Sequence, residues 1–169
     1  MYNKRETMTH FITNIQKNWP EINSHFNPEL VKIHRLQEYL QQDIANVLVE
    51  YKLQQADFSV LAALRRSGKP YCLTPTELIQ SMLFSSGGLT KVLHRISTKG
   101  FIERLDNPQD RRSKWVQLTP AGKVLVEKIM PEIQQLEASH NALTPAEKQQ
   151  LNELLNKMLL NWETPTRAE

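Results

Sequence analysis

The sequence predicts a mainly helical protein with a small β-hairpin, arranged as a winged helix-turn-helix joined to a helical dimerisation lobe. Apolar residues recur at spacings of three and four along most of the chain, which is the periodicity of amphipathic helices. Residues 74–98 show two short helical patterns separated by a tight turn, and residues 101–118 show two strand patterns around a polar loop. With 40% hydrophobic residues and five glycines among 169, the composition suits such a helical fold.

The first helix of the pair begins with a capping box. Thr74 can cap the N-terminus, and Pro75 fits the first helical position, where no N–H is needed. Glu77 can reach back to the backbone of Thr74 as the other half of the box. We therefore expect a helix that runs through Leu78 to Met82.

The second helix follows a turn formed by two serines and two glycines, residues 85–88. The serines can cap a new helix, and the glycines let the backbone approach another group closely. We predict a helix from Ser86 to Thr98, closed by Gly100 in the left-handed conformation.

The two faces of this second helix differ in chemistry. One face is apolar and should pack inward: Leu89, Val92, Leu93 and Ile96. The other carries hydroxyls and cations and no acid: Ser86, Thr90, Lys91, His94 and Arg95. Such groups can hydrogen-bond base edges and hold phosphates in a major groove. A plain solvated face is the alternative, but the order of capped helix, turn, helix and basic hairpin favours nucleic-acid binding.

The hairpin should carry a basic wing. Strands are predicted at Phe101–Leu105 and Lys114–Leu118, and the loop of residues 106–113 is rich in turn formers. Arg111 and Arg112 stand beside Asp110 in this loop. Guanidinium groups bind phosphates and narrow minor grooves. We therefore favour DNA contact over the alternative, a charged hairpin tip that only keeps the protein soluble.

Positive charge is concentrated on this segment. Residues 65–123 hold eleven Lys and Arg against four Asp and Glu, a net charge of +7, whereas the remainder is −4. The whole chain, at +3, hides this asymmetry. A polyanionic partner, double-stranded DNA, is the expected consequence.

The flanking segments supply further helices, expected at residues 8–19, 28–52, 57–67, 120–136 and 145–162. Asn27 and Pro28 begin the long second one, and Thr144 to Glu147 form a capping box before the last. Pro131 should kink or break its helix. The apolar stripe of the first helix should either pack on the rest of the domain or fray and leave Trp19 exposed, and packing is favoured because five apolar groups share one face.

These stripes hold more leucine, isoleucine and valine than one small lobe needs, which indicates a homodimer. We divide the chain into an N-terminal extension helix (1–27), a dimerisation lobe (28–52 and 119–162), a DNA-binding lobe (53–118) and a loose tail (163–169).

Several other classes of protein are disfavoured. The N-terminus has no apolar run of signal-peptide length and no segment approaches the ~20 apolar residues of a membrane span, so we expect a cytoplasmic protein with no membrane partner. Cys72 is the only cysteine, and the five histidines form no i, i+3 or i, i+4 pair, so no metal site is expected. No phosphate-binding glycine loop, nucleophile elbow or paired carboxylates indicate an enzyme, and no cofactor is expected.

The sequence resembles the MarR family of winged helix-turn-helix transcription regulators. The runs that carry the resemblance are Lys99-Gly100-Phe101-Ile102-Glu103-Arg104, Asp110-Arg111-Arg112-Ser113 and Leu118-Thr119-Pro120-Ala121-Gly122. The resemblance covers roughly residues 30–160. It implies that residues 86–98 form a recognition helix, that Arg112 enters the minor groove, and that Asp110 orients it; Arg111 is the alternative. The DNA-binding residues would be Ser85, Ser86, Gly87, Thr90, Lys91, His94, Arg95, Arg111, Arg112 and Lys114.

The expected function is a ligand-responsive repressor that binds pseudo-palindromic operators as a homodimer and responds to a small aromatic or anionic effector. A winged-helix adaptor that binds proteins and no specific DNA is the alternative. The extra N-terminal helix resembles a subgroup that includes PecS and the urate-responsive regulators, and it suggests Trp19, His34 and Ser59 as effector-pocket candidates. Ser59 replaces the aspartate of that subgroup, which argues against urate. Cys72 lies away from the cysteine used by redox-sensing relatives, so an inert thiol is favoured over a sensor.

Overall fold

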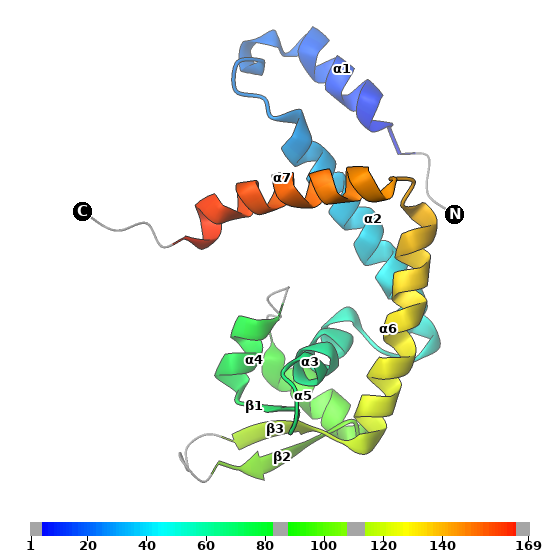
Figure 1. The fold of residues 1–169 in the computed structure, drawn as a ribbon, viewed down its shortest axis with the longest axis vertical. Helices are drawn as coiled ribbons and strands as arrows, with labels where there is room; N and C mark the ends of the chain where they lie inside the picture. The colour runs from blue at the N-terminus through cyan, green and yellow to red at the C-terminus, as the bar shows by residue number, and fades with distance from the viewer. Residues whose placement is uncertain (1–4, 83–87, 108–113, 165–169) are drawn as a thin grey trace, which may run out of the picture. The chain divides into compact units, whose positions relative to one another are not determined.

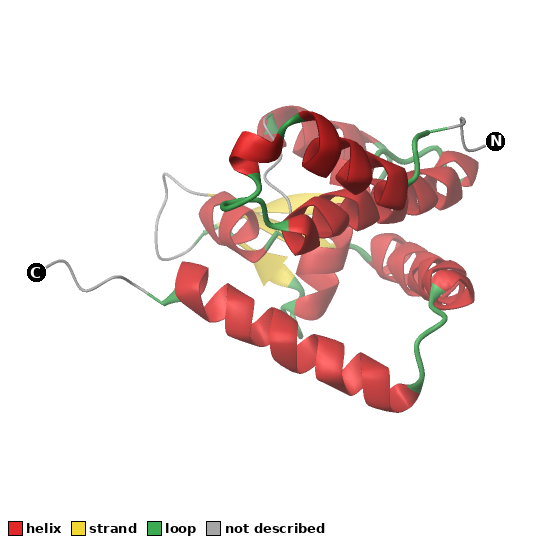
Figure 2. Cartoon of the chain, turned by 90° about the horizontal axis from the view of Figure 1, so that it is seen from above, coloured by secondary structure: helices red, strands yellow, loops and turns green. Residues whose placement is uncertain are grey.

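The computed structural model describes residues 5–82, 88–107 and 114–164, and it is mainly α-helical with one small sheet (Figure 1, Figure 2). This confirms the predicted fold class. Residues 1–133 and 134–169 are two compact units. The elements are α1 (Met8–Asn18), the 3-10 helix η1 (Pro20–Ile22), α2 (Pro28–Glu50), α3 (Gln55–Arg66), β1 (Cys72–Leu73), α4 (Pro75–Ser81), α5 (Leu89–Thr98), β2 (Ile102–Asp106), β3 (Lys114–Leu118), α6 (Pro120–His140) and α7 (Pro145–Glu163).

The core of the first unit lies where α3, α4, α5 and the sheet meet. Helix α3 contacts α2, α4, α5 and β3, so it is the central element of this lobe (Figure 1). Its apolar residues are buried on most sides, as the sequence predicted. The side chains that are at most 2% exposed include Val60, Leu61, Leu64, Leu78, Leu93, Ile96 and Val116. Burial of this apolar surface is the main favourable contribution to folding of the lobe.

The predicted capping boxes are confirmed at two helices. The Glu77 N–H donates to Thr74 Oγ1 (3.3 Å), and the Thr74 N–H donates to Glu77 Oε2 (2.7 Å). Thr144 and Glu147 repeat the arrangement at the start of α7. These bonds to the ionised carboxylates lower the pKa of Glu77 and of Glu147 below the ordinary glutamate value.

Helix α5 begins later than the predicted Ser86. Gly88 occupies its N-cap position with a φ of 93°, a left-handed conformation that glycine adopts without steric cost. Ser85, Ser86 and Gly87 lie outside the described residues. At the other end, Gly100 has a φ of 75°, as expected for the glycine that closes the helix.

The sheet has three strands in the order β1-β3-β2, and all pairs are antiparallel. Strands β2 and β3 form the predicted hairpin, in a register that places Ile102 opposite Leu118 and Asp106 opposite Lys114. Strand β1 was not predicted. Its two residues are too few to show an alternating pattern, and they become a strand only because Cys72 and Leu73 pair with Gln117 and Val116 of β3.

Besides α5, helices α3 and α6 bear on the sequence prediction. Helix α3 starts at Gln55, two residues before the predicted Asp57, because Asp57 forms a capping box with Gln54. Helix α6 continues through Pro131, so of the kink or break that was expected there the break does not occur, and the kink stays a prediction. A proline removes the hydrogen bond to the carbonyl four residues earlier, that of Glu127. Pro131 is exposed, so water can satisfy that carbonyl and the helix need not break.

Apolar side chains remain exposed in both units. Trp19 is 58% exposed and α1 has no fully buried residue, so the expectation that this helix covers Trp19 is wrong for the single chain. Along the first half of α2, four exposed apolar residues follow one another at spacings of three or four: Leu30, Ile33, Leu36 and Leu40. Helix α7 likewise exposes Leu151, Leu154, Leu159, Leu160 and Trp162. None of the described helices is both long and apolar enough to span a bilayer.

Candidate nucleic-acid interface

Helix α5 presents its polar face to solvent. Its four apolar residues pack into the core, with exposed fractions between 0% for Ile96 and 9% for Leu89. Thr90, Lys91 and His94 are exposed. Because the apolar face fixes the rotation of the helix about its axis, the hydroxyl, ammonium and imidazole groups point away from the core. The structure therefore brings three of the predicted contact residues onto one accessible surface.

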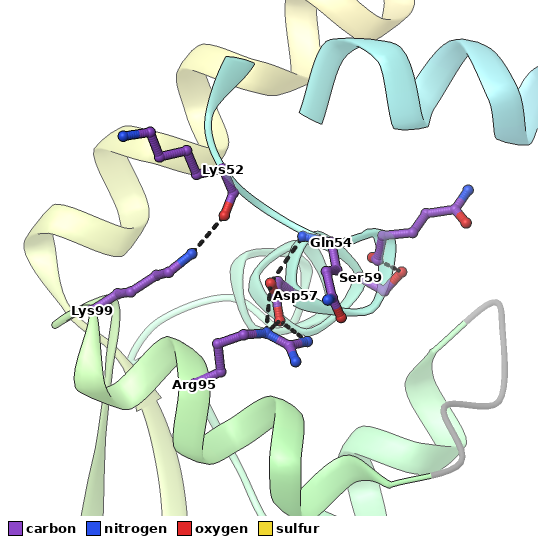
Figure 3. Close-up of polar contacts among 7 residues, drawn as sticks. Lys52, Gln54, Asp57, Ser59, Arg95 and Lys99 are labelled. Atoms are coloured by element: carbon purple, nitrogen blue, oxygen red, sulfur yellow. Dashed lines mark hydrogen bonds and ion pairs between the residues drawn. The ribbon is translucent and has the colours of Figure 1, made fainter. Parts of the chain in front are cut away.

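Arg95 behaves differently from these three residues. Its side chain is 32% exposed and reaches across to α3, where it meets the carboxylate of Asp57 (Figure 3). Nε donates to Oδ1 at 2.8 Å and to Oδ2 at 3.0 Å, and Nη2 donates to Oδ1 at 2.5 Å. These hydrogen bonds raise the pKa of the Arg95 guanidinium above its ordinary value. The two groups form a bidentate ion pair.

Asp57 is fully buried and was not among the predicted site residues. Its Oδ2 also accepts the N–H of Gln54 at 2.9 Å, so the same carboxylate starts α3 and binds α5. The Nζ of Lys99, at the C-terminal end of α5, donates to the carbonyl of Lys52 at 2.6 Å (Figure 3). The segment of residues 52–57 thus holds α5 at two points. An acid in the first turn of a largely apolar helix was the only sequence signal for this role.

The wing is described only at its base. Lys114 is exposed and forms an ion pair with Asp106, its cross-strand partner in the hairpin. Asp110, Arg111 and Arg112, like Ser85, Ser86 and Gly87, lie outside the described residues, so their roles stay predictions from the sequence.

Helix α6 is attached to the same lobe by polar contacts and close packing. Arg65 on α3 donates from Nε to Oε1 of Glu127 at 2.7 Å, and its guanidinium carbon lies 5.1 Å from the centroid of the Tyr71 ring. The ion pair lowers the pKa of Glu127. The first turn of α6 begins where Thr119 Oγ1 accepts the N–H of Gly122 at 3.0 Å. Helix α6 is therefore fixed to α3 and to the end of β3.

The effector-pocket candidates lie on or beside three different helices. Trp19 and His34 are exposed, and the hydroxyl of half-buried Ser59 donates within α3 to the carbonyl of Gln55 at 2.9 Å. The structure gives no hydrogen bond or ion pair between any two of these three residues, all of which lie in described segments. Burial raises the pKa of the half-buried Cys72 thiol, which disfavours the reactive thiolate. Over the described ranges, no three His, Cys, Asp or Glu side chains form a potential metal site.

A lobe of three helices around a buried apolar core, with an antiparallel hairpin and an exposed cationic face on one helix, is the architecture of a winged helix-turn-helix DNA-binding protein. The family model described as MarR family matches residues 51–113. The transcriptional regulator PecS of Dickeya dadantii is 30% identical over 75% of this chain and 76% of its own length. The multiple antibiotic resistance protein MarR of Escherichia coli is 34% identical over 78% of this chain and 93% of its own length.

Solved structures agree with these relatives. A mutant of E. coli MarR complexed with operator DNA superposes with a TM-score of 0.64 at 29% identity, and the match covers 86% of this chain and 97% of that one. BpsR of Bordetella bronchiseptica, whose DNA binding is regulated by 6-hydroxynicotinic acid, gives a TM-score of 0.66 at 28% identity over 80% and 94% of the two chains. The chain belongs to the MarR family and is a DNA-binding transcriptional regulator.

Proposed function

We propose that this protein is a ligand-responsive repressor that binds pseudo-palindromic operators as a homodimer. The observation that carries the proposal is the outer face of α5, where Thr90, Lys91 and His94 are exposed together over a buried apolar face. Hydroxyl and cationic groups on such a helix can read base edges and neutralise phosphates in the major groove.

The remaining contacts surround this helix. Ser85, Ser86 and Gly87 precede α5 in the sequence, and we assign them to phosphates near its N-terminus. Lys114 at the base of the hairpin is exposed and can reach a backbone phosphate. We assign Arg112, or its neighbour Arg111, to the minor groove with Asp110 as orienting partner, on the sequence and the family membership.

The homodimer is supported by the apolar surfaces that a single chain leaves open on α2 and α7, among them Leu36 at 58% and Leu160 at 62% exposure. Surfaces of this kind mark subunit interfaces. Two-fold symmetry would place two copies of α5 in successive major grooves, about 34 Å apart, which requires a pseudo-palindromic site. Because the operator is chromosomal DNA, we propose a cytoplasmic location.

Response to a small molecule is supported by BpsR, whose DNA binding is regulated by 6-hydroxynicotinic acid. We propose an effector of the same chemical class, a small aromatic acid, with Trp19, His34 and Ser59 as the candidate pocket residues. Such a ligand weakens DNA binding only by its difference in affinity between the DNA-bound and the free conformation. Repression follows if the operator overlaps a promoter.

The test is selection of duplexes from a random-sequence pool by the purified protein, followed by mobility-shift titration of the enriched duplex against a scrambled one. We expect an enriched pseudo-palindrome and an affinity that falls steeply with salt. We call the steepness with which log affinity falls against log salt concentration the salt slope. It should be smaller by about one unit in the Arg112→Ala variant if Arg112 holds a phosphate or lies in the minor groove. Failure to retard any duplex at low salt would instead support the protein-binding adaptor.

A further inference from the structure

The polar contact between α3 and α5 is directional, whereas the rest of their contact is apolar. Burial of Leu93 and Ile96 holds α5 against the core, but the hydrophobic effect that drives this burial is itself non-directional. The bidentate pair of Arg95 and Asp57 fixes two donor atoms on one carboxylate. The bond from Lys99 to the carbonyl of Lys52 adds a second point one turn further along α5. Together these bonds define where α5 lies against α3 and the turn before it.

The positive charge of Arg95 compensates the negative charge of the buried Asp57 carboxylate. Asp57 is 0% exposed, and a buried carboxylate is stable in its ionised form only when a charge or several hydrogen bonds compensate the loss of water. Arg95 and the N–H of Gln54 supply that compensation. A guanidinium already neutralised by a carboxylate contributes little to the release of counterions from DNA, since that release depends on cations that neutralise phosphates. Lys91, one turn earlier, is exposed and has no such partner among the described side chains.

We propose that Asp57 and Arg95 are a positioning pair that sets the placement of the recognition helix, and that Arg95 does not itself hold a DNA phosphate. This inference rests on the proposed DNA-binding function and changes the role that the sequence assigned to Arg95. It makes Asp57, a buried residue outside the DNA-facing surface, a determinant of binding selectivity. Thr90, Lys91 and His94 keep their contacts, and the pair determines whether they meet the base edges in register.

Three variants of the full chain separate positioning from phosphate binding. Asp57→Asn removes the acid and leaves Arg95 charged. The double variant Asp57→Asn with Arg95→Gln replaces the ion pair by two amides of similar size without a change in net charge. Lys91→Gln is the matched control, because it removes one cation from the same helix one turn away. Each is titrated at several salt concentrations with the duplex selected by the wild-type protein and with a scrambled duplex, and circular dichroism checks that it is folded.

The expected results differ for each variant. Lys91→Gln lowers the salt slope by about one unit on both duplexes, as loss of one phosphate contact does. The double variant keeps the wild-type slope. Asp57→Asn raises the slope on the scrambled duplex by up to about one unit, because Arg95 is released toward phosphates. Its preference for the selected duplex falls about tenfold, and the double variant, whose two amides can still share a hydrogen bond, recovers part of that preference.

Two results would overturn the inference. The first is a slope in the double variant that falls by about one unit, as in Lys91→Gln, which would make Arg95 a phosphate contact. The second is an Asp57→Asn protein with unchanged slope and unchanged preference. If Asp57→Asn does not fold, the salt slope of the double variant alone decides whether Arg95 holds a phosphate. Failure of the proposed function has a different signature, because then the wild-type protein prefers no duplex and Lys91→Gln changes nothing.

Discussion

Tyr51, directly after α2, donates a hydrogen bond of 2.5 Å from its hydroxyl to Oε1 of Glu132 on α6. The Nζ of Lys128, one turn earlier on α6, lies 5.2 Å from the centroid of the tyrosine ring. The bond to Glu132 is the main reason why the pKa of Tyr51 is raised to about 12. The turn between α2 and α3 is thereby tied to α6 on one side, and through Lys52 to α5 on the other.

This bond makes stability depend on pH at the alkaline end. The Tyr51 hydroxyl keeps its proton to about pH 12 in the folded chain, whereas the unfolded chain releases it near pH 10.0. Between these values the folded state binds more protons, so its stabilisation is complete below pH 10.0 and is lost as the pH rises toward 12. Tyr51→Phe should remove this part of the pH dependence, measured as urea unfolding at pH 9 to 12, with Tyr39→Phe within α2 as control. Parallel pH profiles for the wild type and Tyr51→Phe would contradict the assignment.

Gly122 lies in the first turn of α6, next to the residue that precedes β2 and the last residue of β3. A Cβ at this position would lie 2.1 Å from the carbonyl oxygen of Phe101 and 2.9 Å from Cδ1 of Leu118. The first neighbour is backbone and cannot move aside without shifting the chain. Gly122→Ala, which normally stabilises a helix, should therefore destabilise this protein by about 1–3 kcal/mol in chemical denaturation. Ala121→Gly, at the exposed neighbour, is the control for helix propensity and should cost only about 0.5–1 kcal/mol.

Thr74 begins α4, the first helix of the helix-turn-helix, through its capping box with Glu77. Thr74→Ala removes the side-chain acceptor for the Glu77 N–H and should lower the free energy of unfolding by about 1 kcal/mol. Thermal and urea unfolding measure this loss. Thr13→Ala, at an exposed position on α1, should change stability by no more than about 0.5 kcal/mol, and an equal effect in both variants would reject the cap as the cause.

Leu154 on α7 is 54% exposed, and we place it in the proposed dimer interface. A carboxylate buried there without a partner opposes association, so Leu154→Glu should shift the protein toward monomer and lower operator affinity about tenfold or more. Sedimentation velocity and mobility-shift titration give the two readouts. Gln150→Glu, one turn earlier and exposed, introduces the same charge as a matched control. A Leu154→Glu protein that sediments and binds as the wild type does would remove α7 from the interface.

The sequence by itself determined the features that depend on neighbours within one helical turn. Thr74 with Glu77 and Thr144 with Glu147 start their helices through atoms three residues apart, and Gly100 ends α5 by its own backbone freedom. The apolar spacing of Leu89, Val92, Leu93 and Ile96 decided which face of α5 turns inward. Such local rules were sufficient to predict the helix-turn-helix and the hairpin, whereas the family came from the resemblance of the runs 99–104, 110–113 and 118–122.

The tertiary structure alone decided what depends on residues far apart in the chain. Strand β1 exists because β3 supplies its hydrogen-bond partners, and α6 continues past Pro131, which is exposed, to His140. Arg95 had the same sequence signature as Lys91, yet it is bonded to Asp57, a residue 38 positions away. No local pattern can distinguish the two cations. Only the packing of α5 on α3 brings a buried carboxylate within reach of one of them, and desolvation of that carboxylate makes the pairing necessary.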